Sequence, residues 1–299
     1  MTILAVQGAG TLRGTSVVDQ PAHDSWAQDD ETSRLSRTER SQAAPDRLAV
    51  PRDTVPLVLL HAYPLSSLMW APLAAELTEL PVLTVDLPGA GFSPTVEPVT
   101  IRAAGLAVIE SLKALGVRRA VVVGVSMGGY VVMSLLRDAP GLMAGVVLMH
   151  TKAEADDAAA RAGRLATARQ VLESGTTEVL RSMASKMVSA ASQAAQPGLV
   201  ETIEHWIDQA TPGGVAWAAE AMAGRDDAMA VLRAAGVPST VVAGAVDPFV
   251  SVAQAEAMAD ALGPESDLVI MADVAHLSPV ETPNTVARAI REAYRRMVP

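Results

Sequence analysis

The sequence predicts an α/β fold: a mostly parallel sheet covered by helices on both faces, with a helical cap inserted between two strands. From Val55 onward, short and nearly continuous apolar runs alternate with longer amphipathic stretches. Buried parallel strands joined by helices have this pattern. Between about Lys152 and Arg233 the chain shows only Ala-rich helical pattern, and helices inserted between strands of such a sheet commonly cover its carboxyl edge, where ligands bind.

The composition narrows the function classes. Among 299 residues, 50% are hydrophobic and 3% aromatic, and 23 basic against 33 acidic residues give a formal charge of −10. This charge argues against nucleic acid or an anionic membrane as partners. The absence of cysteine excludes disulfides, thiolate metal sites and Cys nucleophiles. The five histidines lack the spacing of a structural zinc site, and no apolar run resembles a membrane span or signal peptide. We expect a cytoplasmic protein that binds a small molecule and needs no metal or cofactor.

Residues 1–53 differ from the rest and are expected to form an N-terminal extension. Residues 2–18 are compatible with a short hairpin around Gly8 and Gly10, whereas Asp19–Asp53 is polar, without apolar periodicity, and is expected to be partly flexible. The GAGTLRG segment lacks the Lys-Ser/Thr pair of a phosphate loop. We therefore interpret it as a glycine-rich turn.

The remaining chain divides into a core, 54–151 and 234–299, and a cap, 152–233. The expected core strands are 56–62, 81–86, 119–125, 144–150, 239–245 and 266–272. Helical patterns lie around 68–79, 101–115, 127–138, 252–262 and 282–297. Alternation of strands and helices predicts parallel pairing.

The segment Gly124-Val125-Ser126-Met127-Gly128 joins an apolar strand to a helical pattern. At a sharp strand-to-helix turn, glycines two residues before and after a nucleophile remove Cβ clashes. The Met127 amide, at the start of the helix, is positioned to stabilise an oxyanion. Ser126 is therefore the candidate nucleophile.

A serine nucleophile needs a base and an acid that orients it. His276 follows the last expected strand and Asp247 follows the strand before it, so both belong to the same sheet edge as Ser126. Asp156 and Asp157 follow an earlier strand and remain competing acids, with Asp247 preferred. The order serine, aspartate, histidine is that of α/β-hydrolases.

The other histidines receive structural roles. His61 ends the first core strand and is expected to shape the loop whose Tyr63 amide provides the second oxyanion donor. His23, His150 and His205 are expected to be surface or packing residues.

Six segments, in their order along the chain, resemble the motif set of the α/β-hydrolase superfamily, in particular bacterial serine hydrolases similar to 3-oxoadipate enol-lactonases and carboxylesterases. These segments are LLHAYP, VDLPGAGFS, GVSMGGYV, HTKAEADDAAARAGR, GAVDPF and AHLSPVETP. The resemblance runs from about residue 54 to the C-terminus. It implies an α/β-hydrolase fold, catalytic roles for Ser126, Asp247 and His276, and oxyanion donors at Tyr63 and Met127. Ala62 and Ala275 replace frequent family glycines, which is expected to shift geometry without removing a reacting group.

The nucleophile type indicates the reaction. Haloalkane dehalogenases and epoxide hydrolases have aspartate where this chain has Ser126, so acyl transfer on an ester, lactone or thioester is expected, and a carboxylesterase or lactonase is preferred. A lyase, cyclase, perhydrolase or ligand-binding protein with the same pocket is the alternative. An enol-lactonase would need a cation for its substrate carboxylate, from Arg161, Arg164, Arg181 or Arg225. We expect an apolar substrate pocket lined by Leu65, Trp206, Trp217, Phe249 and Leu277.

Overall fold

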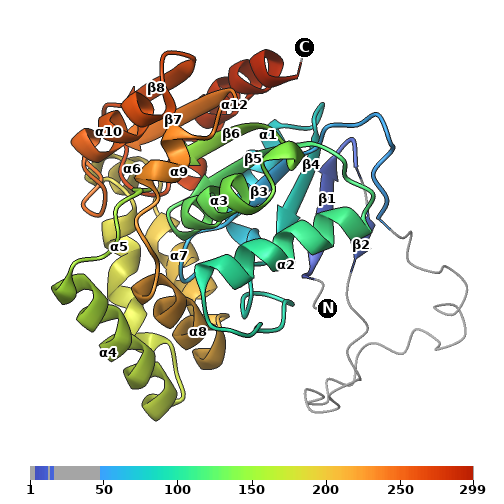
Figure 1. The fold of residues 1–299 in the computed structure, drawn as a ribbon. Coiled ribbons are helices and arrows are strands. Elements are labelled where there is room, and N and C mark those ends of the chain that lie inside the picture. Colours follow the sequence, from blue (N-terminus) through green and yellow to red (C-terminus); the bar gives the residue numbers. More distant parts are fainter. Residues whose placement is uncertain (1–3, 13, 17–47, 299) are drawn as a thin grey trace, which may run out of the picture.

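The computed structural model describes residues 4–12, 14–16 and 48–298. Within these residues the chain forms one eight-stranded sheet in the order β2-β1-β4-β3-β5-β6-β7-β8 (Figure 1). The strands from β4 to β8 along this order are parallel, whereas β1 runs antiparallel to both β2 and β4. The α/β class with a mostly parallel sheet is thus confirmed.

All six core strands that the sequence predicts are present, with ends within three residues of the expected ones. Strands β3 to β6 are almost entirely buried, which explains why apolar residues occupy consecutive positions rather than alternate ones. Their bounds are Leu57–Leu60 (β3), Pro81–Val85 (β4), Ala120–Val125 (β5), Met143–Met149 (β6), Ser239–Gly244 (β7) and Ser266–Met271 (β8).

The N-terminal hairpin belongs to the core sheet. Strand β1 (Val6–Gly10) pairs with β2 (Gly14–Ser16) and, on its other side, with β4. The Leu4 amide donates to the Ser111 hydroxyl at 2.8 Å, which ties the start of the chain to a core helix. The predicted hairpin therefore forms, but Gly8 and Gly10 lie in its first strand rather than at its turn, and the core does not begin at residue 54 as expected. The predicted flexibility of Asp19–Asp53 falls mostly on 17–47, outside the described residues.

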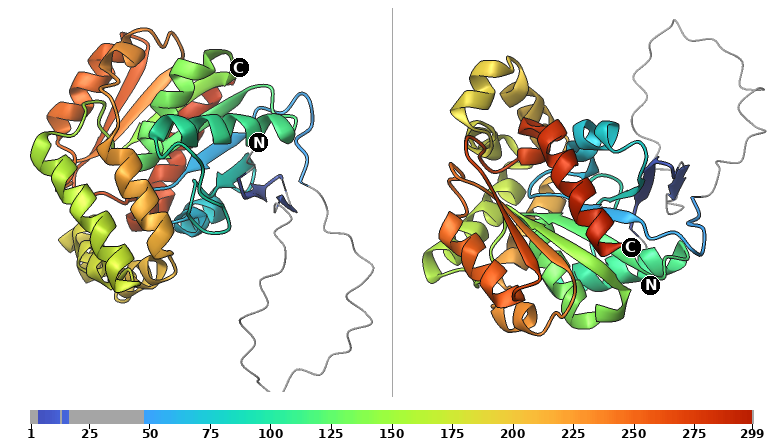
Figure 2. Two further views of the ribbon diagram at one scale, coloured as in Figure 1. Left: turned by 60° about the horizontal axis from the view of Figure 1, so that its bottom comes forward. Right: turned by 90° about the horizontal axis from the view of Figure 1, so that it is seen from above.

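Helices cover both faces of the sheet (Figure 2). On one face α2 (Ile101–Ala114), α3 (Met127–Asp138), α9 (Met229–Arg233) and α10 (Val252–Leu262) pack together, and on the other lie α1 (Ala71–Glu76) and α12 (Pro283–Met297) with the short α11 (Ser278–Glu281). The predicted helix 68–79 is divided into a 3-10 turn, Ser67–Trp70, and α1. A second 3-10 turn, Pro140–Leu142, precedes β6.

A helical cap lies between β6 and β7 in the chain. It contains α4 (Ala158–Ser174), a 3-10 turn (Glu178–Met183), α5 (Ala184–Met187), α6 (Ala190–Ala195), α7 (Leu199–Asp208) and α8 (Pro212–Ala223). Helices α4 and α8 pack against each other below the sheet in Figure 1. The prediction of an inserted helical cap is confirmed.

The last strand departs from the prediction of burial on both faces. Strand β8 lies at the edge of the sheet, and its Leu268 and Ile270 side chains are 38% and 41% exposed. An apolar run therefore does not by itself distinguish a central strand from an edge strand. In the part of the chain that the structure describes, no helix has the length and hydropathy of a membrane span.

Candidate active site

Ser126 occupies a strained turn between β5 and α3. Its φ of 54° and ψ of −113° lie in a region that residues with a Cβ rarely adopt. The Thr151 hydroxyl donates to the Ser126 carbonyl at 2.8 Å and helps to fix the turn. The side chain is partly exposed and does not cap the helix, so its hydroxyl is free to face a ligand.

The glycines around Ser126 are required by close backbone contacts. A Cβ on Gly124 would overlap the backbone of Gly128, and a Cβ on Gly128 would overlap the Leu60 carbonyl. The turn thus packs its own backbone against β3. This geometry explains the spacing that the sequence shows.

The Gly128→Ala variant is expected to lower the free energy of unfolding by about 2 kcal/mol or more, because backbone must move to admit the methyl group. Urea unfolding measures the change. Gly141→Ala is the matched control, since nothing lies within 4 Å of its added Cβ, and it is expected to change stability by about 0.5 kcal/mol or less. Equal stability of the two variants would contradict the packing argument.

The loop after β3 carries Tyr63, whose amide is the second candidate oxyanion donor beside that of Met127. His61 is fully buried; its Nε2 accepts from the Leu87 amide at 2.9 Å, and its Nδ1 donates to the Ala62 carbonyl at 3.0 Å. Burial lowers the pKa of His61, which agrees with the neutral ring that this bonding requires. His61 therefore fixes the course of the loop that carries Tyr63.

The Tyr63 and Met127 amides are the candidate oxyanion donors. Met127 is the first residue of α3, where backbone N–H groups lack helical partners, and neither amide donates to another residue in the described chain. Both residues line a small cavity of about 20 Å³. The Tyr63 hydroxyl is also buried without a partner among the described residues.

Asp247 and His276, the candidate acid and base, are joined by a hydrogen bond. The two residues follow β7 and β8, and His276 Nδ1 donates to Asp247 Oδ2 at 2.8 Å. The other carboxylate oxygen, Oδ1, accepts from the amides of Phe249 at 2.8 Å and Val250 at 3.2 Å. The carboxylate orientation is thus fixed from both sides.

The environment keeps Asp247 ionised. Burial by itself would raise the pKa of this carboxyl group, but the hydrogen bonds from His150 and His276 outweigh it and hold the pKa well below the ordinary value. An ionised carboxylate can stabilise a positive charge that develops on the base.

The competing acids have other partners. Asp157 caps α4 by accepting from the Ala160 amide at 2.7 Å. Asp156 pairs with Arg164 at 2.6 Å and Arg225 at 2.8 Å, and its side chain is 1% exposed. Asp247 is therefore the acid that contacts His276.

The His276 loop is bonded to the cap. The His276 and Leu277 amides donate to the Met187 carbonyl at 3.0 and 2.9 Å. Glu281 is 2% exposed, and its carboxylate accepts from the Ala275 amide at 3.0 Å on the core side and from the Ser189 amide at 2.8 Å on the cap side. One buried carboxylate therefore joins the His276 loop to the cap.

His150 differs from the expectation of a surface or packing residue. It is fully buried at the end of β6; its Nδ1 lies 3.3 Å from Asp247 Oδ2, and its Nε2 lies 2.7 Å from the Ser278 hydroxyl. The only sequence signal was its place at a strand end, on the same edge as the other site residues. His23 lies outside the described residues, and His205 is exposed on α7.

His150, Asp247 and His276 also offer ligand atoms within 4.8 Å of one another, an arrangement compatible in principle with a metal ion. Both Nδ1 atoms face the same carboxylate oxygen at hydrogen-bond distance. Because an ionised carboxylate only accepts, both rings must carry their proton on Nδ1. Hydrogen bonding thus accounts for the cluster.

A surface groove of about 280 Å³ leads toward the oxyanion donors. It shares Pro64, Leu65, Ala90 and Ala210 with the small cavity beside Tyr63 and Met127. Its apolar lining also includes Leu68, Phe92 and Trp206.

The five residues expected in the pocket separate into three groups. Leu65 and Trp206 line the groove. Phe249 is 38% exposed and packs edge-on against the His276 ring, with centroids 4.8 Å apart. Trp217 is instead a buried packing residue that donates to the Val96 carbonyl at 2.7 Å, and Leu277 is fully buried after His276.

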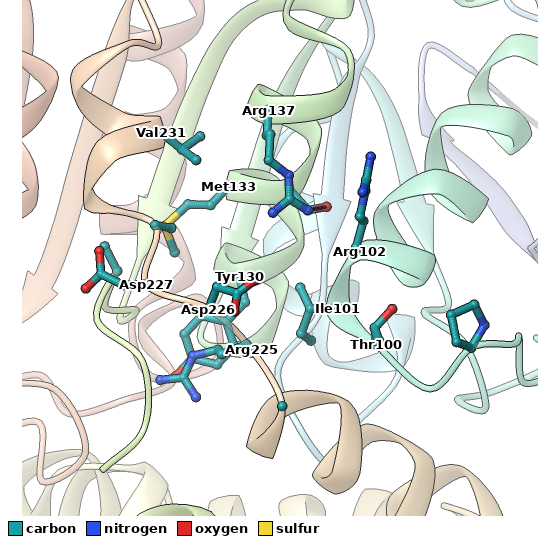
Figure 3. A pocket seen from close by; sticks show the side chains of 15 residues that line it. Thr100, Ile101, Arg102, Tyr130, Met133, Arg137, Arg225, Asp226, Asp227 and Val231 are labelled. Atoms are coloured by element: carbon teal, nitrogen blue, oxygen red, sulfur yellow. Dashed lines mark hydrogen bonds between the residues drawn. The ribbon is translucent and has the colours of Figure 1, made fainter.

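A larger cavity of about 330 Å³ lies between α2, α3 and the 224–231 segment (Figure 3). Tyr130 lies in its wall, and the Arg225 guanidinium packs against the face of the Tyr130 ring, with its Cζ 4.1 Å from the ring centroid. None of Ser126, Asp247 and His276 lines this cavity, the groove or the small cavity, but Met127, next to Ser126 in the chain, lines the small cavity. Volume alone therefore does not identify the candidate site.

The fold and the strained turn at Ser126 identify the class of protein. The sequence model of the α/β hydrolase fold family matches residues 55–283, and the chain belongs to this family. Within it, the chain is related to 3-oxoadipate enol-lactonases and esterases.

The relatives span most of the chain. The 3-oxoadipate enol-lactonase 2 of Acinetobacter baylyi is 30% identical over 216 residues, which cover 72% of this chain and 79% of the relative. A malate-bound thermophilic esterase from Thermogutta terrifontis is 33% identical, with a TM-score of 0.78 over 81% of this chain and 90% of the other. The Burkholderia xenovorans enol-lactonase, 23% identical, shares the fold with a TM-score of 0.72 over 83% and 94% of the two chains.

Proposed function

We propose that the protein is a serine hydrolase that cleaves a carboxylic ester or lactone of a small, largely apolar substrate through an acyl-enzyme on Ser126. The observation that carries the proposal is the Asp247–His276 hydrogen bond of 2.8 Å, on the sheet edge where Ser126 occupies its strained turn. The relationship to esterases and enol-lactonases supports the same chemistry.

In the proposed reaction, His276 takes the Ser126 proton as Oγ attacks the carbonyl carbon, and Asp247 stabilises the resulting imidazolium. The Tyr63 and Met127 amides hold the oxyanion. The tetrahedral intermediate then expels the alcohol, which receives the proton from His276. Water then gives a proton to His276 as its oxygen attacks the acyl carbonyl; the bond between the acyl carbon and Ser126 Oγ breaks, the carboxylic acid leaves, and His276 returns the proton to Oγ.

The apolar side chains of the groove support an apolar substrate. Leu65, Leu68, Phe92 and Trp206 contribute apolar surface. Burial raises the pKa of Tyr63, so its unpartnered hydroxyl stays protonated and can donate to a substrate oxygen.

The arginines that could hold a substrate carboxylate are mostly engaged elsewhere. Arg164 and Arg225 both pair with Asp156, and Arg181 pairs with Asp208 at 2.7 Å. Arg161 is exposed on α4. We therefore favour an uncharged ester or lactone over an anionic enol-lactone.

A fluorophosphonate probe followed by mass spectrometry tests the proposal. We expect stoichiometric labelling at Ser126, because the probe phosphonylates serines that an adjacent base activates. Labelling at another serine would refute the assignment. No labelling of the folded protein would instead favour the alternative of a lyase, cyclase, perhydrolase or ligand-binding protein with this pocket.

A further inference from the structure

The candidate acid binds two imidazoles at one oxygen. Asp247 Oδ2 accepts from His276 Nδ1 at 2.8 Å and lies 3.3 Å from His150 Nδ1. With the two amides on Oδ1, the carboxylate faces four N–H donors. A serine, histidine and aspartate mechanism uses only one of these imidazoles, so His150 has no role in the reaction described above.

The backbone of His150 is held in a conformation that favours glycine. Its φ is 47°, and a residue with a Cβ keeps such a conformation when its surroundings impose it. The His150 amide donates to the Val242 carbonyl at 2.9 Å, which fixes the turn after β6. The turn directs the ring toward Asp247.

The other ring nitrogen has a partner that selects the tautomer. Ser278 is fully buried, and its hydroxyl contacts His150 Nε2 at 2.7 Å. Burial lowers the pKa of His150, partly offset by its bond to Asp247. In a neutral ring whose Nδ1 donates to a carboxylate, Nε2 must accept, which fits the Ser278 hydroxyl as donor.

We propose that His150 is a positioning residue for Asp247, a second neutral imidazole whose Nδ1–H shares the carboxylate oxygen with His276 and limits how strongly Asp247 stabilises protonated His276. This inference rests on the proposed function, in which His276 is the base. The charged or titratable groups around His150 are Asp247 after β7, His276 after β8 and Glu281 on α11. A carboxylate oxygen that accepts from two N–H groups stabilises positive charge on His276 less strongly than an oxygen that accepts from His276 alone.

The experiment compares three variants by the acid limb of the kcat/KM profile with a p-nitrophenyl ester. His150→Leu removes the donor and fills much of the space, and the acid limb of its kcat/KM profile is expected to shift to higher pH by about 0.5–1 pH unit. His150→Asn keeps an N–H near the position of Nδ1 and tolerates positive φ, so its limb is expected to stay near that of the wild type. His205→Ala, at an exposed histidine, is the control. An unmoved limb in folded His150→Leu, or equal shifts in both His150 variants, would overturn the proposal.

A second measurement needs neither a variant that folds nor a substrate. Nitrogen NMR of the wild-type imidazoles is expected to show His150 with its proton on Nδ1 and none on Nε2. A proton on Nε2 alone would overturn the proposal, because Nδ1 could not then donate to Asp247. These results are separable from the proposed function: failure of the probe to label Ser126 refutes that function, whereas a labelled protein with the wrong His150 tautomer refutes only the role of His150.

Discussion

The Ser126→Ala variant is expected to lose ester hydrolysis by on the order of 10⁴-fold or more in kcat, because the acyl-enzyme cannot form. Its stability is expected to remain within about 0.5 kcal/mol of the wild type. The Ser126 side chain does not cap α3, and alanine keeps the Cβ that the turn already accommodates. Steady-state kinetics together with urea unfolding separate lost chemistry from lost structure.

Ser134→Ala is the matched control for this variant. Ser134 lies on α3, the helix that follows Ser126, and its hydroxyl contacts Arg137 at 3.4 Å. Its activity is expected to stay within a few-fold of the wild type. A pre-steady-state burst that persists in Ser126→Ala would show that another residue carries the acyl group.

The Asp247→Asn variant is expected to lower kcat by on the order of 10³- to 10⁴-fold with a smaller change in KM, because an amide cannot stabilise the imidazolium and can select the wrong His276 tautomer. It is also expected to lower the free energy of unfolding by about 2–4 kcal/mol. Both carboxylate oxygens face N–H donors, so the amide NH₂ necessarily meets at least one of them.

The pH dependence of stability provides a second check on Asp247. Since its pKa is lower in the folded protein than in the unfolded chain, its contribution to stability is fully present above about pH 4 and decreases as the pH falls. In urea unfolding between pH 7 and 3, the free energy of unfolding of Asp247→Asn is expected to fall less with decreasing pH than that of the wild type.

Asp156→Asn is the matched control for the acid. It disturbs the buried contacts with Arg164 and Arg225, so it is expected to cost stability while keeping kcat within about ten-fold of the wild type. A larger loss of kcat in Asp156→Asn than in Asp247→Asn would reverse the assignment of the acid.

The sequence predicts the parts of this protein in which one local signal determines the result. The buried strands β3 to β6 appear as continuous apolar runs, and Gly124 is required by its contact with the backbone of Gly128, four residues further along the chain. Asp247 and His276 could be paired in advance because parallel strands bring their carboxyl ends to one edge.

Other features depend on contacts that no local pattern contains. The place of β1 beside β4 results from pairing across about 75 residues of chain, much of it polar. His150 follows the same kind of strand as the other site residues, and only the positive φ and the approach of Asp247 and Ser278 distinguish it from a packing histidine. Trp217 looked like a pocket residue by composition, but its position depends on the fold of the cap against Val96.

Because Met187 and Glu281 bond to the His276 loop, the cap helps to hold this loop in place as well as covering the site. A chimera that received the cap of a relative would hold this loop only if the backbone of the new cap placed a carbonyl and an amide where those of Met187 and Ser189 lie. Specificity engineering by cap exchange is therefore constrained at this contact as well as at the bond from Trp217 to Val96, whereas replacements in α4 or α7 leave the contact with the His276 loop intact.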